Sequence, residues 1–231
     1  MWRYAIFGVF VLGIPGAVQA NELTFSFGGT VASEYVSSGV YYADGLAIQP
    51  YVELGYGGFY AGAYAANTSG VLTGYTAEYG LSLGYRGEAG PVNYDIGVAY
   101  YIFDEVAGFS TPDYPEYIVS AYVAATESFY LTGRVAFAPE YDSTNLRLRL
   151  DYYTPVAGLS VGAAVGFADT NYGDWEYWTI DATYAVIDNV SLGLGYHGSN
   201  YNANVGGTNG TDGGLVVAST LWRSKLHRRA G

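Results

Sequence analysis

Most of this chain alternates between apolar and polar side chains in segments of roughly ten residues. The clearest case is 144–153, where Leu146 and Leu148 lie on one face and Arg147 and Arg149 on the other. Successive side chains of a β-strand point to opposite sides, so a period of two indicates strands whose two faces meet different surroundings. The pattern predicts an all-β fold.

The segments predict about twelve strands, joined alternately by short turns and longer loops. This arrangement is typical of outer-membrane proteins, whose short turns face the periplasm and whose longer loops face outward. We therefore predict a single antiparallel transmembrane β-barrel with both chain ends in the periplasm. The expected strands are 23–37, 46–56, 59–67, 76–86, 92–103, 115–126, 129–139, 144–153, 159–168, 175–186, 190–198 and 212–222.

Composition favours this barrel over a soluble β-sandwich or lipocalin-like barrel, which the alternation alone also allows. Only 13% of the residues are charged, whereas a soluble barrel needs charged side chains over its outside. The polar faces are mostly Gly, Ala, Ser and Tyr. Aromatic residues near predicted strand ends suit membrane interfaces, where they form girdles; these are Tyr56, Phe59, Tyr85, Phe129 and Tyr152 near the short turns, and Trp175, Trp178 and Tyr196 near the longer loops.

The first 20 residues have the features of a secretory signal peptide. Arg3 precedes an apolar run that ends before Pro15, and Val18–Ala20 supplies the small residues of a cleavage site. A signal peptide followed by a barrel predicts export through the periplasm to the outer membrane of a Gram-negative bacterium. The expected partners are outer-membrane lipids and the barrel-assembly machinery. The predicted divisions are a signal peptide at 1–20, an outer-membrane β-barrel at 21–222 and a basic C-terminal tail at 223–231.

The charge of the chain is strongly negative and unevenly placed. The formal net charge is −12, and the 21 acidic residues all lie between 22 and 212, where the basic residues are only Arg86, Arg134, Arg147 and Arg149. Nucleic acid is not a partner, because nothing on such a body neutralises phosphates. The chain has no cysteine, which excludes disulfides and thiolate metal sites. No cofactor is predicted, and turn-forming Asp and Asn explain the loop 169–174 better than a calcium site does.

The polar faces of the predicted strands define a candidate pore lining, because the apolar faces must then contact lipid. An arginine facing the bilayer core would cost about 2–4 kcal/mol, and this register turns all four inward. The lining would form a charged constriction that sorts solutes. In the alternative, the same groups pair and fill a closed interior, since twelve strands lie between filled eight-stranded and open sixteen-stranded barrels. The candidates are Glu34, Gln49, Glu53, Glu78, Arg86, Asp95, Arg134, Arg147, Arg149, Asp151 and Asp181.

An enzymatic function is not predicted. The only histidines are His197 and His227, of which His227 lies in the tail, and Ser199 shares the predicted face of His197. A hydrolase needs a nucleophile placed beside a base, and the sequence supplies no such geometry. A barrel hydrolase centred on His197 therefore remains a third alternative.

Several segments resemble the TorF-type porin family of proteobacterial outer-membrane barrels, whose members are mostly uncharacterised. These segments are Ala32–Gly39, Ala47–Pro50, Gly58–Gly62 and Asn93–Tyr101, and the similarity runs over about 22–222. The resemblance implies a barrel and a channel but no established substrate. Barrels of this kind usually end at an aromatic residue that the assembly machinery reads; Trp222 fits that place, although a basic tail follows it here.

The predicted function is passive, charge-biased diffusion of small polar solutes or ions through a narrow outer-membrane porin. The alternative is a non-conducting barrel with a structural or loop-mediated binding role. The sequence leaves the solute and the oligomeric state open. Acidic side chains in and beside the longer loops would favour cations; they are Asp44, Asp104, Glu105, Asp113, Glu116, Glu140, Asp142, Asp169, Asp174, Glu176 and Asp212.

Overall fold

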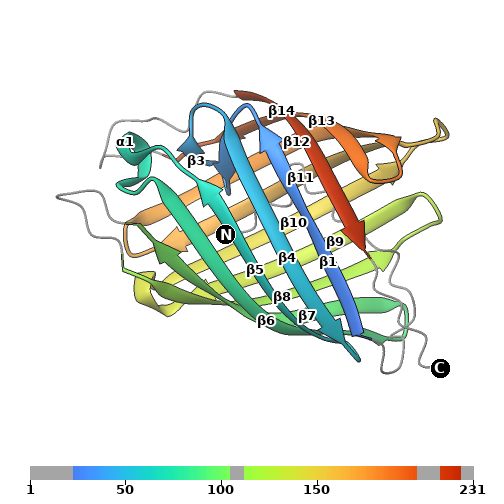
Figure 1. Ribbon diagram of the computed structural model, residues 1–231, viewed down its shortest axis with the longest axis horizontal. Coiled ribbons are helices and arrows are strands. Elements are labelled where there is room, and N and C mark those ends of the chain that lie inside the picture. Colours follow the sequence, from blue (N-terminus) through green and yellow to red (C-terminus); the bar gives the residue numbers. More distant parts are fainter. Residues whose placement is uncertain (1–22, 105–111, 202–213, 225–231) are drawn as a thin grey trace.

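The computed structural model describes residues 23–104, 112–201 and 214–224, in which twelve strands form a closed antiparallel barrel (Figure 1). Strand β1 (Leu23–Ala32) closes it, because β1 pairs with β4 (Ala47–Tyr56) on one side and with β14 (Gly214–Ser224) on the other. The predicted all-β barrel is confirmed. The predicted signal peptide and the tail beyond residue 224 lie outside the described residues.

The remaining barrel strands follow in chain order, each paired with the next. A four-residue helix, α1 (Gly70–Thr73), and a single 3-10 turn, η1 (Pro139–Tyr141), lie in connections. No helix in the described part of the chain is long and apolar enough to cross a membrane. The other barrel strands are β5 (Phe59–Asn67), β6 (Ala77–Ala89), β7 (Val92–Phe103), β8 (Tyr114–Ala124), β9 (Phe129–Ala138), β10 (Ser143–Tyr153), β11 (Leu159–Thr170), β12 (Gly173–Ile187) and β13 (Val190–Ser199).

The expected first strand, 23–37, is wrong at its C-terminal end. Strand β1 stops at Ala32, and a separate hairpin of β2 (Tyr35–Ser37) and β3 (Val40–Ala43) follows. The turn residues Ser38 and Gly39 both have positive φ, 51° and 76°, the combination that a two-residue type I′ hairpin turn requires. A short alternating segment does not itself say whether it extends the previous strand or starts a new sheet.

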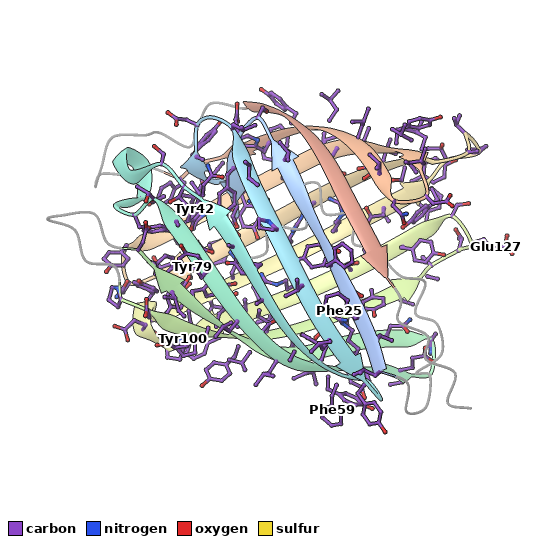
Figure 2. All side chains as sticks on the ribbon, viewed as in Figure 1. Phe25, Tyr42, Phe59, Tyr79, Tyr100 and Glu127 are labelled. Atoms are coloured by element: carbon purple, nitrogen blue, oxygen red, sulfur yellow. The ribbon has the colours of Figure 1, made fainter. Side chains whose placement is uncertain are left out.

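The outer face of the barrel is apolar along its length. Leu81 and Leu83 on β6 are 54% and 61% exposed, and Leu146, Leu148 and Leu150 on β10 are 44–49% exposed. Figure 2 shows side chains projecting outward all around the strands. Apolar residues exposed in this regular band face lipid in outer-membrane barrels, so the predicted register is the one that the structure adopts.

Inside the barrel, large tyrosine side chains lie across glycines of the neighbouring strand. Tyr64 is paired with Gly80 and Tyr60 with Gly84. A Cβ added at Gly80 would lie 2.0 Å from the ring of Tyr64, and one at Gly84 would lie 2.4 Å from that of Tyr60. These glycines therefore make room for tyrosine rings inside a closed wall.

We expect Gly80→Val to destabilise the barrel, because the new side chain displaces the ring of Tyr64 from the interior. Overpacking of this kind costs about 1–3 kcal/mol. The matched control is Gly133→Val on β9, since a Cβ at Gly133 meets nothing within 4 Å. Urea unfolding followed by heat-modifiable gel migration measures both variants, and equal unfolding midpoints would contradict the packing argument.

Candidate functional site

The predicted lining residues, apart from Glu34, lie on strand faces that point into the barrel. The cross-strand pairs Gln49–Thr30 and Arg86–Asp95 join inward faces, as does Asp181–Gly162. These residues come from β4, β6, β7, β9, β10 and β12, on opposite sides of the ring. The inward faces of the described strands carry four arginines against seven carboxylates, namely Glu53, Glu78, Glu88, Asp95, Glu116, Asp151 and Asp181.

Glu34 does not belong to a strand. It lies half-buried in the connection between β1 and β2, at the base of the hairpin. Burial raises the pKa of its carboxyl above the usual range, and the nearby carboxylate of Asp44 raises it further. The prediction extended β1 through this residue, and the hairpin moves it out of the wall.

Arg86 on β6 is the centre of the first charged cluster. Its guanidinium donates two hydrogen bonds to the carboxylate of Glu53, at 2.7 and 2.8 Å, and one to Asp95, at 3.0 Å. The ring of Tyr60 lies 4.0 Å from the guanidinium carbon, and its hydroxyl donates to Asp95 at 2.8 Å. Planar bidentate pairing of this kind fixes an arginine side chain on one wall.

Arg149 on β10 is the centre of a second cluster across the barrel from the first. It pairs with Asp181 through two hydrogen bonds, at 2.7 and 2.8 Å, and with Asp151 at 2.7–3.1 Å. A Cβ at Gly162 would lie 2.1 Å from the guanidinium, so that glycine leaves the space which Arg149 crosses. Two carboxylates surround one cation, and the cluster keeps a net negative charge.

A third set of polar contacts lies deeper among aromatic rings. Arg134 donates to Glu116 at 3.1 Å, and the hydroxyl of Tyr101 donates to the same carboxylate at 3.3 Å. The hydroxyl of Tyr64 donates to Glu78. Glu116 was predicted beside a longer loop as part of an acidic mouth, but it is 8% exposed inside β8, where alternate positions point inward.

The three arginines of β9 and β10 form a row on one wall. Arg147 lies opposite Arg134 in the β9–β10 register, and Arg149 follows two residues along the same face. The row runs from the middle of the barrel toward the short turns. The described residues contain no group of three or more His, Asp or Glu side chains placed to hold a metal ion.

The tip of the β2–β3 hairpin contacts the inner wall formed by β12 and β13. The indole Nε1 of Trp175 donates to the carbonyl oxygen of Ser38 at 2.7 Å. A Cβ at Gly39 would lie 2.6 Å from the Cβ atoms of both Ser199 and Tyr177, so the turn fits against the wall without free space. Trp175 therefore faces inward, and its assignment to an outer aromatic girdle was wrong.

Other residues of the hairpin contact different parts of the same end of the barrel. The ring of Tyr41 meets the imidazole of His197 edge-on at 5.2 Å. The carbonyl oxygen of Tyr42 accepts a hydrogen bond from the backbone N–H of Ser69, beside α1, at 2.7 Å. Figure 2 places Tyr42 near the α1 end of the barrel and Glu127 at the opposite end.

The interior is densely packed at the long-loop end and more open at the short-turn end. Tyr35 of the hairpin is 2% exposed, and inward-facing Tyr101 and Ala136 are 2% and 1% exposed. Nearer the short turns, the side chain of Arg86 is 41% exposed and that of Glu53 25%. The hairpin and the surrounding tyrosines therefore fill the end at which the longer loops lie.

His197 is 1% exposed on the inner face of β13. Within the described part of the chain, neither of its ring nitrogens has a hydrogen-bond partner. The hydroxyl oxygen of Ser199 accepts from the backbone N–H of Tyr201 at 3.0 Å. No serine–histidine pair is formed there, so the geometry does not support a hydrolase centred on His197.

The described loops at the long-loop end are acidic, and the carboxylate of Asp104 joins two of them. Asp104, directly after β7, accepts hydrogen bonds from the backbone N–H and hydroxyl of Thr76, at 2.8 and 2.5 Å, and from the N–H of Ala77. Slight desolvation acts to raise the pKa of Asp104, but these hydrogen bonds outweigh it and lower the pKa below its usual range. The carboxylate form thus joins the end of β7 to the start of β6.

We expect this connection to weaken in acid. Because the folded-state pKa of Asp104 is depressed, its contribution is present above the ordinary value of 3.8 and is lost as the pH falls through the folded-state pKa. In Asp104→Asn, the connection between the end of β7 and the start of β6 should already be weaker at neutral pH. Hydrogen exchange measures the protection of the Thr76 and Ala77 amides, which should fall, and Asp188→Asn at a distant turn is the control. Unchanged amide protection in Asp104→Asn would contradict this role.

Comparison with known proteins identifies a family and a fold. The chain matches a family described as "Bacterial protein of unknown function (Gcw_chp)" over residues 17–222. It belongs to that family. No curated protein matches the chain, and the narrower resemblance to TorF-type porins stays a prediction.

Solved structures of porins share the fold of this Gcw_chp protein. A structure described as KdgM porin is similar with a TM-score of 0.62 and 9% sequence identity, covering 87% of this chain and 99% of that one. For KdgM porin in complex with disordered oligogalacturonate, the TM-score is 0.57 and the sequence identity 7%, and the match covers 89% of this chain and 99% of that one. For NanC porin, the TM-score is 0.53 and the sequence identity 9%, and the match covers 88% of this chain and 100% of that one. The fold is therefore a porin-like β-barrel.

Proposed function

We propose that this Gcw_chp protein is an outer-membrane porin for passive, cation-biased diffusion of small polar solutes or ions. The observation that carries the proposal is a closed barrel whose outside is apolar and whose inside carries charged side chains on opposite walls. An apolar outer band suits a lipid bilayer, and a charged interior suits water and ions. The porin-like fold supports the same conclusion.

The proposal includes a location and partners. The predicted signal peptide, 1–20, would direct export through the periplasm of a Gram-negative bacterium, and the barrel-assembly machinery would insert residues 21–222 into the outer membrane. Both ends of the barrel sequence, at Leu23 and Ser224, lie at the short-turn end, since Ser224 is paired with Ser26 of β1. The longer loops would then face outward, as in other barrels of this class.

The cation bias follows from how the interior charges are paired. Arg86 and Arg149 each contact two carboxylates, so their positive charge is more than balanced within each cluster. The described loops add carboxylates and no basic residue, and charges of one sign at a mouth concentrate counter-ions. One KdgM structure is of a complex with oligogalacturonate. An interior with excess carboxylates does not favour such an anionic ligand.

Planar-bilayer recording tests the proposal. We expect the refolded chain without its predicted signal peptide, residues 21–231, to give discrete current steps, after heat-modifiable migration has shown that the barrel is folded. In a potassium chloride gradient, the reversal potential should indicate cation preference. An anion-selective current would overturn the bias, and a folded barrel that is silent at every voltage would contradict diffusion through an always-open passage.

Substitution of Arg149 tests the source of the selectivity. Arg149→Gln removes one positive charge and releases the carboxylates of Asp151 and Asp181, so the cation-to-anion permeability ratio should rise severalfold. Arg149→Lys is the matched control, because it keeps the charge but loses the bidentate geometry. The cation-to-anion permeability ratio of Arg149→Lys should stay close to that of the parent. Equal ratios in all three proteins would show that these residues do not line the passage.

A further inference from the structure

We propose that the β2–β3 hairpin is a displaceable plug that holds the long-loop end of the barrel closed. This inference rests on the proposed porin function and adds to it a closed state and the segment that produces it. The plug is residues 33–46, which join β1 to β4. The contacts that carry the inference lie at its base, at its tip and in the space around it.

The plug is an insertion that the barrel wall does not need. Ala32, the last residue of β1, is directly paired with Ala47, the first residue of β4. Two strands in that register can be joined by a two-residue turn, yet the chain places 14 further residues between them (33–46). Tyr35 and Val36 of this segment are 2% and 4% exposed, so the extra length is packed inside rather than exposed to solvent.

The tip of the plug is shaped to fit the opposite wall. Gly39 has a φ of 76°, and a Cβ there would lie 2.6 Å from Ser199 and from Tyr177. Both the backbone conformation and the lack of space therefore require glycine. The hydrogen bond from Trp175 to Ser38 reaches the same turn from β12. Contacts of this precision fix one position of the hairpin across the interior.

The contact between the plug and the wall also has a feature that favours release. Among the described residues, both ring nitrogens of His197, the hydroxyl of Thr179 and the hydroxyl of Ser37 are buried and have no hydrogen-bond partner. His197 and Thr179 are cross-strand neighbours, and His197 contacts Tyr41 of the plug. Buried polar groups without partners lower the stability of a contact, and water reaches them once the hairpin leaves. The contact between the packed hairpin and the wall is therefore less stable than the packing of an ordinary protein core.

The first experiment removes the plug without disturbing the wall. Residues 33–46 are replaced by Asn-Gly, a dipeptide that favours the two-residue turn joining Ala32 to Ala47. We expect heat-modifiable migration like that of the parent, and single-channel conductance or liposome swelling with small neutral sugars that is severalfold greater. If the parent is silent and the plug-free barrel conducts, the plug is supported and always-open diffusion is overturned.

The other outcomes separate the two proposals. Equal conductance of the parent and the folded plug-free barrel overturns the plug and leaves the porin function standing. Silence of both folded proteins overturns the porin function and, with it, the plug as the element that closes a passage. Failure of the deletion variant to fold would show that the wall needs this segment, which also overturns the plug as an independent element.

Point substitutions test the tip while the hairpin stays in place. Gly39→Val should increase open time or conductance, because the turn no longer fits against Ser199 and Tyr177. Gly45→Val is the matched control within the same segment, since a Cβ there meets nothing within 4 Å. Trp175→Phe should act in the same direction as Gly39→Val, with outward-facing Trp178→Phe as its control. Identical currents in each variant and its control would overturn the role of the tip contact.

Discussion

The pairing of β1 with β14 is the constraint on which the rest of the structure depends. A sheet of twelve strands with free edges leaves backbone hydrogen-bonding groups unpaired, and the bilayer in which we propose that the barrel lies would offer no water to satisfy them. Closing the ring through Ser26 and Ser224 removes both edges. Closure also divides the side chains into two groups, because each strand must then present one face to the outside and the other to a confined interior.

The confined interior explains why charges and glycines occur together. A charge taken from water into such a space is costly unless another charge is close. Arg86 meets carboxylates from β4 and β7, and Arg149 meets one from its own strand and one from β12. Long side chains crossing the space need small neighbours, which Gly162 supplies for Arg149 and Gly80 for Tyr64. Charge pairing and close packing are thus two consequences of the same limited volume.

The β2–β3 hairpin decides which part of that volume stays open. At the long-loop end it brings Tyr35, Tyr41 and Tyr42 among the inward tyrosines of β7 and β8. At the short-turn end the charged clusters around Arg86 and Arg149 keep partial exposure. The long-loop end is therefore filled, whereas the interior at the short-turn end is more open.

The sequence by itself determined the twelve strands of the barrel wall, apart from where the first one ends, and the direction of nearly every charged side chain in them. A period of two assigns each residue to a face without any long-range information. The sequence also located the short turns and the acidic loops. Tertiary structure alone decided that β1 ends at Ala32, that Trp175 and Glu116 point inward, and that residues 35–43 fold into the barrel. These depend on contacts between distant segments, such as Trp175 with Ser38. Alternation within a segment is the same whether its partner is the next strand of the wall or a hairpin inside it.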